Sequence, residues 1–191
     1  MNLPGGLDEP ARRERKRFEA RYEAFIKEAQ EISLSILVWG PNPQSDSPVA
    51  KKRIEIREEL IKLGHNAMFS EDLSLQTDNL SEKSKEFAQA LAAHLIIILV
   101  EDAPGASAEA HDFCNHPDLA PKVYVMIPKK YMQGYSAQGA IKDLSDGYGG
   151  VHWYEDEDLG ICNVRKQAVI RAEARRWIYY VSERGRGYER P

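Results

Sequence analysis

The chain has 191 residues, of which 42% are hydrophobic and 29% are charged, a composition typical of a one-domain globular protein. The net charge of −4 is unevenly distributed: residues 31–164 carry 11 Lys and Arg against 21 Asp and Glu, whereas residues 165–191 carry eight Lys and Arg against three Glu. The acidic body lacks the basic surface of a protein that binds duplex nucleic acid, and the composition excludes disordered and fibrous proteins.

The first segment, residues 8–30, has the pattern of an amphipathic helix. Its apolar positions recur at helical spacing, and most of its other positions are Arg or Glu. These apolar positions are Phe18, Tyr22, Phe25, Ile26 and Ala29. Such a stripe needs a surface to cover, so we expect this helix to pack on the domain or to form a contact between copies of the chain.

From residue 33 onward, short apolar runs alternate with helical stretches. The runs that predict strands are 34–38, 65–69, 94–100, 122–127 and 150–154, and the stretches that predict helices are 49–63, 80–93, 107–115 and 159–182. Alternation with short links is typical of βαβ units. We therefore predict an α/β domain with a parallel sheet of four to five strands, helices on both faces and an extra N-terminal helix. The run at 94–100 is apolar on both faces, as a central parallel strand must be.

Three segments organise the chain. Residues 1–31 are an N-terminal helical extension, residues 32–182 are the α/β domain, and residues 183–191 are an Arg/Gly-rich tail. The basic end of the chain predicts either a contact with nucleic acid or an acidic partner, or a solvated helix face with a frayed end. Residues 129–149 are rich in Gly and predict either a lid or a plain surface loop.

In an open parallel sheet, ligands bind beyond the C-terminal ends of the strands. The residues that we assign to substrate binding at these ends are Trp39, Gly40, Ser70, Asp72, Asp102, Gly105 and Ser107. Trp39 could stack on a nicotinamide or adenine ring, or cover the core. Asp102 could bind a ribose hydroxyl, or cap a helix. The helix start after Gly105 offers backbone N–H groups to an anion.

Glu109 falls in the first turn of that helix and should point toward the same crevice. Cleavage of an N-glycosidic bond passes through a sugar cation, which a neighbouring carboxylate stabilises or traps, as in glycoside hydrolysis. If the leaving group is nicotinamide, it departs as a neutral molecule, so no general acid is needed and one Glu could carry most of the chemistry. The alternative is that Glu109 only interacts with the helix dipole, worth about 0.3–1 kcal/mol.

Parts of the chain resemble bacterial TIR-like domains. The segments that carry this resemblance are 35–40, 64–72 and 93–100, which look like the first three strands, and 104–109, which resembles the Ser-x-Glu block. The resemblance covers about residues 33–155 and implies a single three-layer flavodoxin-like domain, a layout shared with nucleoside 2-deoxyribosyltransferases. In that family the Glu of the block is the glycosidic-bond catalyst, which corresponds to Glu109.

The resemblance implies a TIR-like enzyme that cleaves the nicotinamide–ribose bond of NAD, by hydrolysis or cyclisation, in bacterial anti-phage defence. NAD would be the substrate, and no resident cofactor is expected. Two alternatives stay open: a deoxyribosyltransferase-like enzyme or nucleotide N-glycosidase, and a non-catalytic TIR-like interaction module. The expected partners are a small-molecule nucleotide, further copies of the chain as a homo-oligomer and an effector protein, with no duplex nucleic acid and no membrane.

Other sequence features bear on the cellular location, the cofactors and the metal content of the protein. The two cysteines are too few for a disulfide framework, and residues 1–6 do not begin the apolar core of a signal peptide. The longest apolar run has six residues, whereas a membrane-spanning helix needs about 20. We therefore expect a cytoplasmic protein. No P-loop or dinucleotide-binding Gly motif is present. His111, Asp112, Cys114 and His116 fall on several helix faces, which argues against a metal site. His65 and His94 are interpreted as structural. The cations of residues 51–53 face a phosphate or form a solvated surface.

Overall fold

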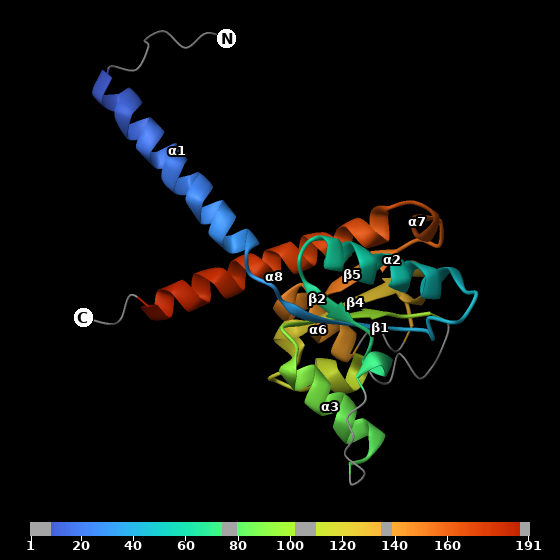
Figure 1. Cartoon of the computed structure of the whole chain (residues 1–191). Helices are drawn as coiled ribbons and strands as arrows, with labels where there is room; N and C mark the ends of the chain where they lie inside the picture. Colours follow the sequence, from blue (N-terminus) through green and yellow to red (C-terminus); the bar gives the residue numbers. More distant parts are fainter. Residues whose placement is uncertain (1–8, 74–79, 102–109, 135–138, 188–191) are drawn as a thin grey trace.

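The computed structural model describes residues 9–73, 80–101, 110–134 and 139–187, with the backbone alone for 184–187 (Figure 1). Its strands are β1 (Ser35–Trp39), β2 (Asn66–Met68), β3 (Leu95–Leu99), β4 (Val123–Pro128) and β5 (Val151–Tyr154). Every neighbouring pair is parallel, and the order across the sheet is β2-β1-β3-β4-β5. This order is that of a flavodoxin-like fold, which confirms the predicted fold class.

Strand β3 lies at the centre of this sheet, as its composition predicts. It pairs with β1 on one side and with β4 on the other, with Ile97 opposite Val38 and Tyr124. All its residues are buried, because helices cover both faces of the sheet at this position. A strand covered on both faces has no solvent-facing positions, which explains the uninterrupted apolar run.

Two helical layers enclose the sheet. The residues buried on one face pack under α2 (Pro48–Lys62) and α8 (Asn163–Gly187). Those on the other face pack under α3 (Glu82–Ala92), the helical residues 110–114 and α6 (Ala140–Tyr148). The remaining elements are α1 (Glu9–Gln30), α7 (Glu157–Gly160) and the 3-10 turns η1 (Ser70–Asp72), η2 (Ala120–Lys122) and η3 (Lys129–Tyr131). The three-layer architecture is therefore confirmed.

The start and end of α2 follow local sequence rules. Ser47 caps the helix, its hydroxyl accepting a hydrogen bond from the backbone N–H of Ala50 at 3.0 Å, and Pro48 occupies the first turn, where its missing N–H costs nothing. At the other end Gly64 adopts a φ of 84°, a left-handed conformation that favours glycine. These two caps fix where the loop after β1 ends and where the approach to β2 begins.

Two helices differ from the sequence-based expectation. Residues 129–149 were expected to form a lid or a plain loop, but residues 140–148 form α6, while residues 135–138 of this region lie outside the described residues. Ile141 and Leu144 are buried against the sheet, and Gly149 ends α6 at a φ of 57°, so this glycine marks a helix end. The last helix begins at Asn163 and not at 159, and it continues to Gly187, into the segment assigned to the tail. The carboxylate of Asp158 accepts hydrogen bonds from Asn163 and from the N–H of Glu155, which sets α7 apart as a separate turn.

Helix α1 departs most from the expectation that it packs on the domain. It extends away from the body in Figure 1 and contacts α8 near its own C-terminal end. Ala29 is buried there and Glu28 accepts a hydrogen bond from the Tyr180 hydroxyl at 2.9 Å. Farther out, Phe18 and Tyr22 are 67% and 56% exposed. The outer part of the helix therefore does not dock on the domain, and the alternative expectation, a contact between copies of the chain, stays a prediction.

Candidate functional site

The strand order locates the point where a ligand site is expected. The chain goes from β1 outward to β2 and then returns to the other side of β1 with β3, so the connections after β1 and β3 leave in opposite directions. In open α/β sheets such a switch point leaves a crevice at the carboxyl ends of the two strands. The described residues that follow these strands are the loop 40–47 after β1 and Val100 with Glu101 after β3.

Gly40 begins the loop after β1 and approaches β3 closely. Its φ is 150°, and a Cβ atom at this position would lie 2.9 Å from the carbonyl oxygen of Leu99 and 3.3 Å from the Leu99 Cβ. Any other residue would push these backbones apart and adopt a conformation that L-residues avoid. Glycine therefore lets the ends of β1 and β3 close together at the switch point.

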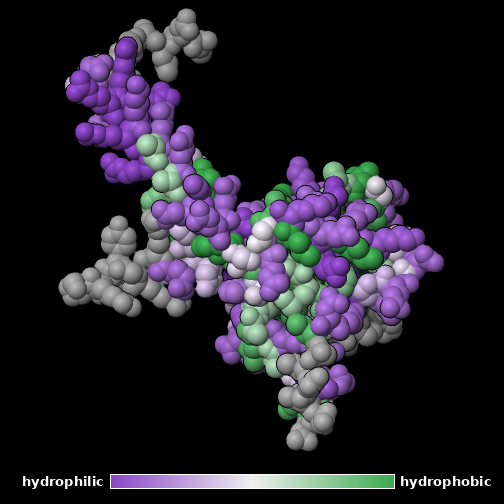
Figure 2. Space-filling model, in the orientation of Figure 1, coloured by the Kyte–Doolittle hydropathy of each residue, from purple (hydrophilic) through white to green (hydrophobic). Residues whose placement is uncertain are grey.

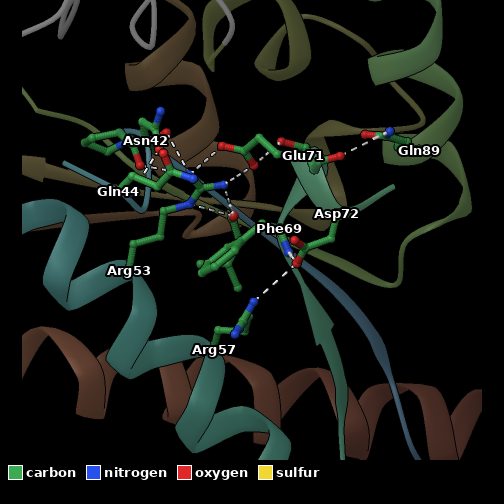
Figure 3. A network of polar contacts seen from close by, with 12 residues as sticks. Asn42, Gln44, Arg53, Arg57, Phe69, Glu71, Asp72 and Gln89 are labelled. Carbon is green, nitrogen blue, oxygen red and sulfur yellow. Dashed lines mark hydrogen bonds and ion pairs between the residues drawn. The ribbon is translucent and has the colours of Figure 1, made fainter. Parts of the chain in front are cut away.

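Arg53 fixes the path of this loop from the buried side of α2 (Figure 3). Its guanidinium donates to the carbonyl oxygen of Val38 from Nε at 3.0 Å and from a terminal nitrogen at 2.8 Å, and to the carbonyl oxygens of Gly40 at 3.2 Å and Pro41 at 2.8 Å. It also forms a two-pronged ion pair with the Glu71 carboxylate, at 2.8 and 2.7 Å. One fully buried side chain thus joins the loop after β1 to the turn after β2.

The Glu71 carboxylate is held ionised by this arrangement. Partial burial by itself raises the pKa of Glu71, but the hydrogen bonds from Arg53, from a backbone N–H and from the Ser70 hydroxyl outweigh it, and the net effect lowers the pKa. Ser70 donates to Glu71 at 3.0 Å. The ion pair therefore persists at neutral pH, where the loop after β1 stays fixed.

The ring of Phe69 packs against two arginines of the same network. The guanidinium carbons of Arg53 and Arg57 lie 4.4 and 4.2 Å from its centroid. Arg57 also binds the carboxylate of Asp72 at 3.2 Å, and that carboxylate accepts the backbone N–H of Phe69 at the same distance. Asp72 therefore holds the turn η1 against α2, and its predicted contact with substrate remains a prediction.

Trp39 ends β1 on the opposite face of the sheet. It is 4% exposed, and its ring lies 4.6 Å from that of Phe113, which in turn lies 5.2 Å from Phe87. The indole N–H has no hydrogen-bond partner among the described residues, and unpaired buried donors are uncommon in proteins. Trp39 thus covers the core in the described part of the chain.

Tyr154 fixes the backbone of the first residue after β3. This last residue of β5 is fully buried, and its hydroxyl donates to the carbonyl oxygen of Val100 at 2.9 Å. The N–H of Val100 donates in turn to the carbonyl oxygen of Met126 at 2.9 Å. The first residue after β3 is therefore held from both sides, which fixes the direction in which the chain leaves the sheet.

The sequence-predicted site residues divide into two groups. Trp39, Gly40, Ser70 and Asp72 are described, and Arg53 with Glu71 links Gly40 to Ser70, whereas Trp39 and Asp72 point into other packing. Asp102, Gly105, Ser107 and Glu109 lie outside the described residues. Arg53 and Glu71 were missed as organisers of this edge. Arg53 follows two lysines at a helix start, and only its partner 18 residues later distinguishes it from surface charge.

Two pockets adjoin the turn after β2. One, of about 300 Å³, is mainly apolar and lies between the start of β1, Met68 and α3. The other, of about 360 Å³, shares Gln89 with it and is lined by Glu71, Glu82 and Glu86 together with one lysine. Burial and the nearby Glu82 raise the pKa of Glu86. A phosphate group would meet several carboxylates in this second pocket, so we assign no nucleotide to it.

His65 and His94 lie at the opposite edge of the sheet, before β2 and β3. The Nδ1 atom of His65 accepts the backbone N–H of Leu34 at 3.4 Å while its Nε2 lies 3.1 Å from Glu173, and the Nδ1 of His94 accepts the N–H of Ser35 at 3.0 Å. Burial, reinforced by neighbouring cations, lowers the pKa of both rings. Both are held neutral at the start of β1, in keeping with a structural role.

No three His, Cys, Asp or Glu side chains of the described residues gather as metal ligands. Cys114 is buried, which raises the pKa of its thiol to about 12 and leaves it uncharged, and Asp112 instead pairs with Lys83 at 2.6 Å. Among the helices that the structure describes, none combines the length and apolar character needed to cross a bilayer. No protein-family model matches the chain, and no curated protein matches it significantly.

Proposed function

We propose that this chain cleaves the nicotinamide–ribose bond of NAD, by hydrolysis or cyclisation, with Glu109 as the catalytic carboxylate. One observation carries the proposal. Ala110, the next residue in the chain, is fully buried in the hydrophobic cluster that also contains Trp39, the last residue of β1. Glu109 itself lies outside the described residues, and it directly precedes this buried residue in the sequence.

Cleavage of this bond requires from the protein mainly one negative charge beside the sugar. The bond between the nicotinamide nitrogen and the ribose carbon breaks, and its electron pair stays on the nitrogen, which becomes neutral. The positive charge moves to the sugar, where the Glu109 carboxylate would stabilise it. In hydrolysis, water adds to the same carbon and releases one proton, which gives ADP-ribose. In cyclisation, an adenine nitrogen adds instead of water.

The described residues supply a rigid frame for such a substrate. Gly40 lets the ends of β1 and β3 lie close together, and Arg53 holds the backbone of the loop after β1 in place. Trp39 would close this frame from the core side, because its ring is buried against Phe113. Asp102, Gly105 and Ser107 are proposed to bind the ribose and phosphate groups. Preorganised backbone of this kind is what dinucleotide recognition at a switch point requires.

The test is incubation of the purified full-length chain with NAD, with products identified by mass spectrometry. The proposal expects free nicotinamide together with ADP-ribose or its cyclic form. Many bacterial proteins of the family that the sequence resembles act in anti-phage defence, so we propose the same setting and include extract from phage-infected cells as an activator. Release of a base from nucleosides or nucleoside monophosphates, with NAD left intact, would favour the deoxyribosyltransferase-like alternative.

A further inference from the structure

The two terminal helices expose apolar side chains beside their mutual contact. The terminal-helix patch consists of Phe18 and Tyr22 on α1 and Trp177, Ile178 and Val181 on α8. These side chains are 37–67% exposed, and the rings of Phe18 and Tyr22 stack on each other with centroids 6.2 Å apart. Figure 2 shows hydrophobic surface collecting where α1 meets α8, next to the hydrophilic outer part of α1.

The spacing of these residues is that of helices that pair with other helices. On α1 the apolar positions 18, 22, 25 and 29 follow one another at intervals of four, three and four, and on α8 the positions 174, 177 and 181 follow at three and four. At the inner end of the α1 stripe α8 provides the cover: Ala29 is buried, and the ring of Phe25 meets that of Tyr180 edge to face at 5.9 Å. The outer end continues the same stripe into solvent.

We propose that a second copy of this chain covers the terminal-helix patch, with the α1 helices of the two copies antiparallel and centred near Tyr22. The charge along α1 supports this orientation. Residues 12–21 carry six Lys or Arg against two Glu, whereas residues 22–31 carry one Lys against three Glu. An antiparallel pair brings each basic half beside an acidic half, while a parallel pair would bring like charges together.

The size of the patch fits a dimer that uses both helices. A fully covered aromatic side chain buries about 150–250 Å². With the fractional exposures above, the five patch residues offer on the order of 500 Å² per copy, and the pair therefore offers on the order of 1,000 Å² before the flanking Arg stems are counted. Stable interfaces bury about 1,200–2,000 Å² in total. Helix α1 alone would fall well short, so the exposed residues of α8 belong to the interface.

An anionic membrane surface fits this helix less well. Membrane-surface helices carry a broad apolar face opposite their cations. The uncovered part of α1 offers two aromatic rings, a narrow seam that suits another helix.

The mass of the full-length chain in solution tests the proposal, measured by sedimentation velocity over a range of concentrations. We expect twice the 21.7 kDa chain mass for the wild type. Tyr22→Glu places a charge at the centre of the seam and should raise the dimer dissociation constant by about 30-fold or more, as loss of a central hot spot does. Ala20→Glu, which adds the same charge on the opposite, exposed face of α1, should leave the dissociation constant unchanged.

Disulfide trapping in a Cys162→Ser background tests the orientation. Tyr22→Cys chains should cross-link to each other, and Phe18→Cys chains should cross-link with Phe25→Cys chains but not with themselves; cross-linking of Phe18→Cys with itself overturns the antiparallel arrangement. The proposal is overturned if the wild type is monomeric at every concentration. It is also overturned if Tyr22→Glu and Ala20→Glu have equal dissociation constants while their circular dichroism is unchanged. A monomer that co-sediments with phosphatidylserine vesicles overturns it in favour of a membrane surface.

Discussion

Replacing Arg53 with Met tests whether one buried guanidinium holds the candidate site together. Methionine fills much of the same volume but donates no hydrogen bonds. The carbonyl oxygens of Val38, Gly40 and Pro41 would lose a donor, and the carboxylate of Glu71 would lose its partner. We expect the loop after β1 to loosen and the free energy of unfolding to fall.

The size of this loss follows from the burial of the two partners. Arg53 is fully buried, and removing one partner of a buried ion pair costs about 3–5 kcal/mol. The Glu71 side chain is 50% exposed, so water solvates it once it is unpaired, and the low end of that range applies, about 3 kcal/mol. Part of this cost arises from the buried carbonyl oxygen of Val38, because an unsatisfied buried acceptor costs about 1–3 kcal/mol.

Arg57→Met is the matched control. Arg57 lies one turn along the same helix and stacks on the same Phe69 ring, but its side chain is 29% exposed and its ion pair with Asp72 is at the surface. Such a pair is worth under about 1 kcal/mol. Urea unfolding followed by circular dichroism gives both values. If Arg53→Met loses less than about 1 kcal/mol more than Arg57→Met, the reasoning about the buried network is wrong.

Three further predictions concern the frame around the site. Burial lowers the pKa of His65 and His94 in the folded chain, so below about pH 6.5 the unfolded chain binds more protons than the folded one. The urea midpoint of unfolding should therefore fall as the pH drops below about 6.5, and a midpoint that does not change with pH would contradict this. Gly40→Ala should destabilise by about 1–3 kcal/mol because its Cβ meets the backbone of β3, and more than Gly64→Ala, which has open space; equal melting temperatures would refute the close approach. Tyr154→Phe should cost about 1–3 kcal/mol in urea, and no loss would show that its buried acceptor finds another donor.

Local patterns were sufficient to predict the sheet. The apolar run that forms β3 has no polar face, so a central position was the favoured reading, and Gly40 with Pro41 marked the end of β1 to within a residue. Residues 129–149 were harder, because their glycines suggested a loop while the buried positions Ile141 and Leu144 form a helix against the sheet. Composition predicts flexibility in such a segment, whereas packing decides its structure.

Non-local pairing explains what the sequence could not reveal about the site. Arg53 reads as one more cation at a helix start, and nothing within one turn of it indicates that Glu71 will meet it under the loop after β1. The apolar stripe that includes Phe18 and Tyr22 likewise predicts that these side chains are covered, but it does not indicate which surface covers them. The catalytic assignment of Glu109 rests on a resemblance, and its position lies outside the described residues.

The most direct test of the central claim is the rate of nicotinamide release from NAD by wild type, Glu109→Gln and Glu58→Gln. Glu58 lies exposed on α2, so its variant controls for the same substitution away from the crevice. With an active wild type, Glu109→Gln should reduce the rate by about 10²–10³-fold at unchanged stability, because it removes the charge that stabilises the sugar cation, and Glu58→Gln should leave it unchanged. Nicotinamide release by Glu109→Gln at the wild-type rate would contradict the proposed mechanism.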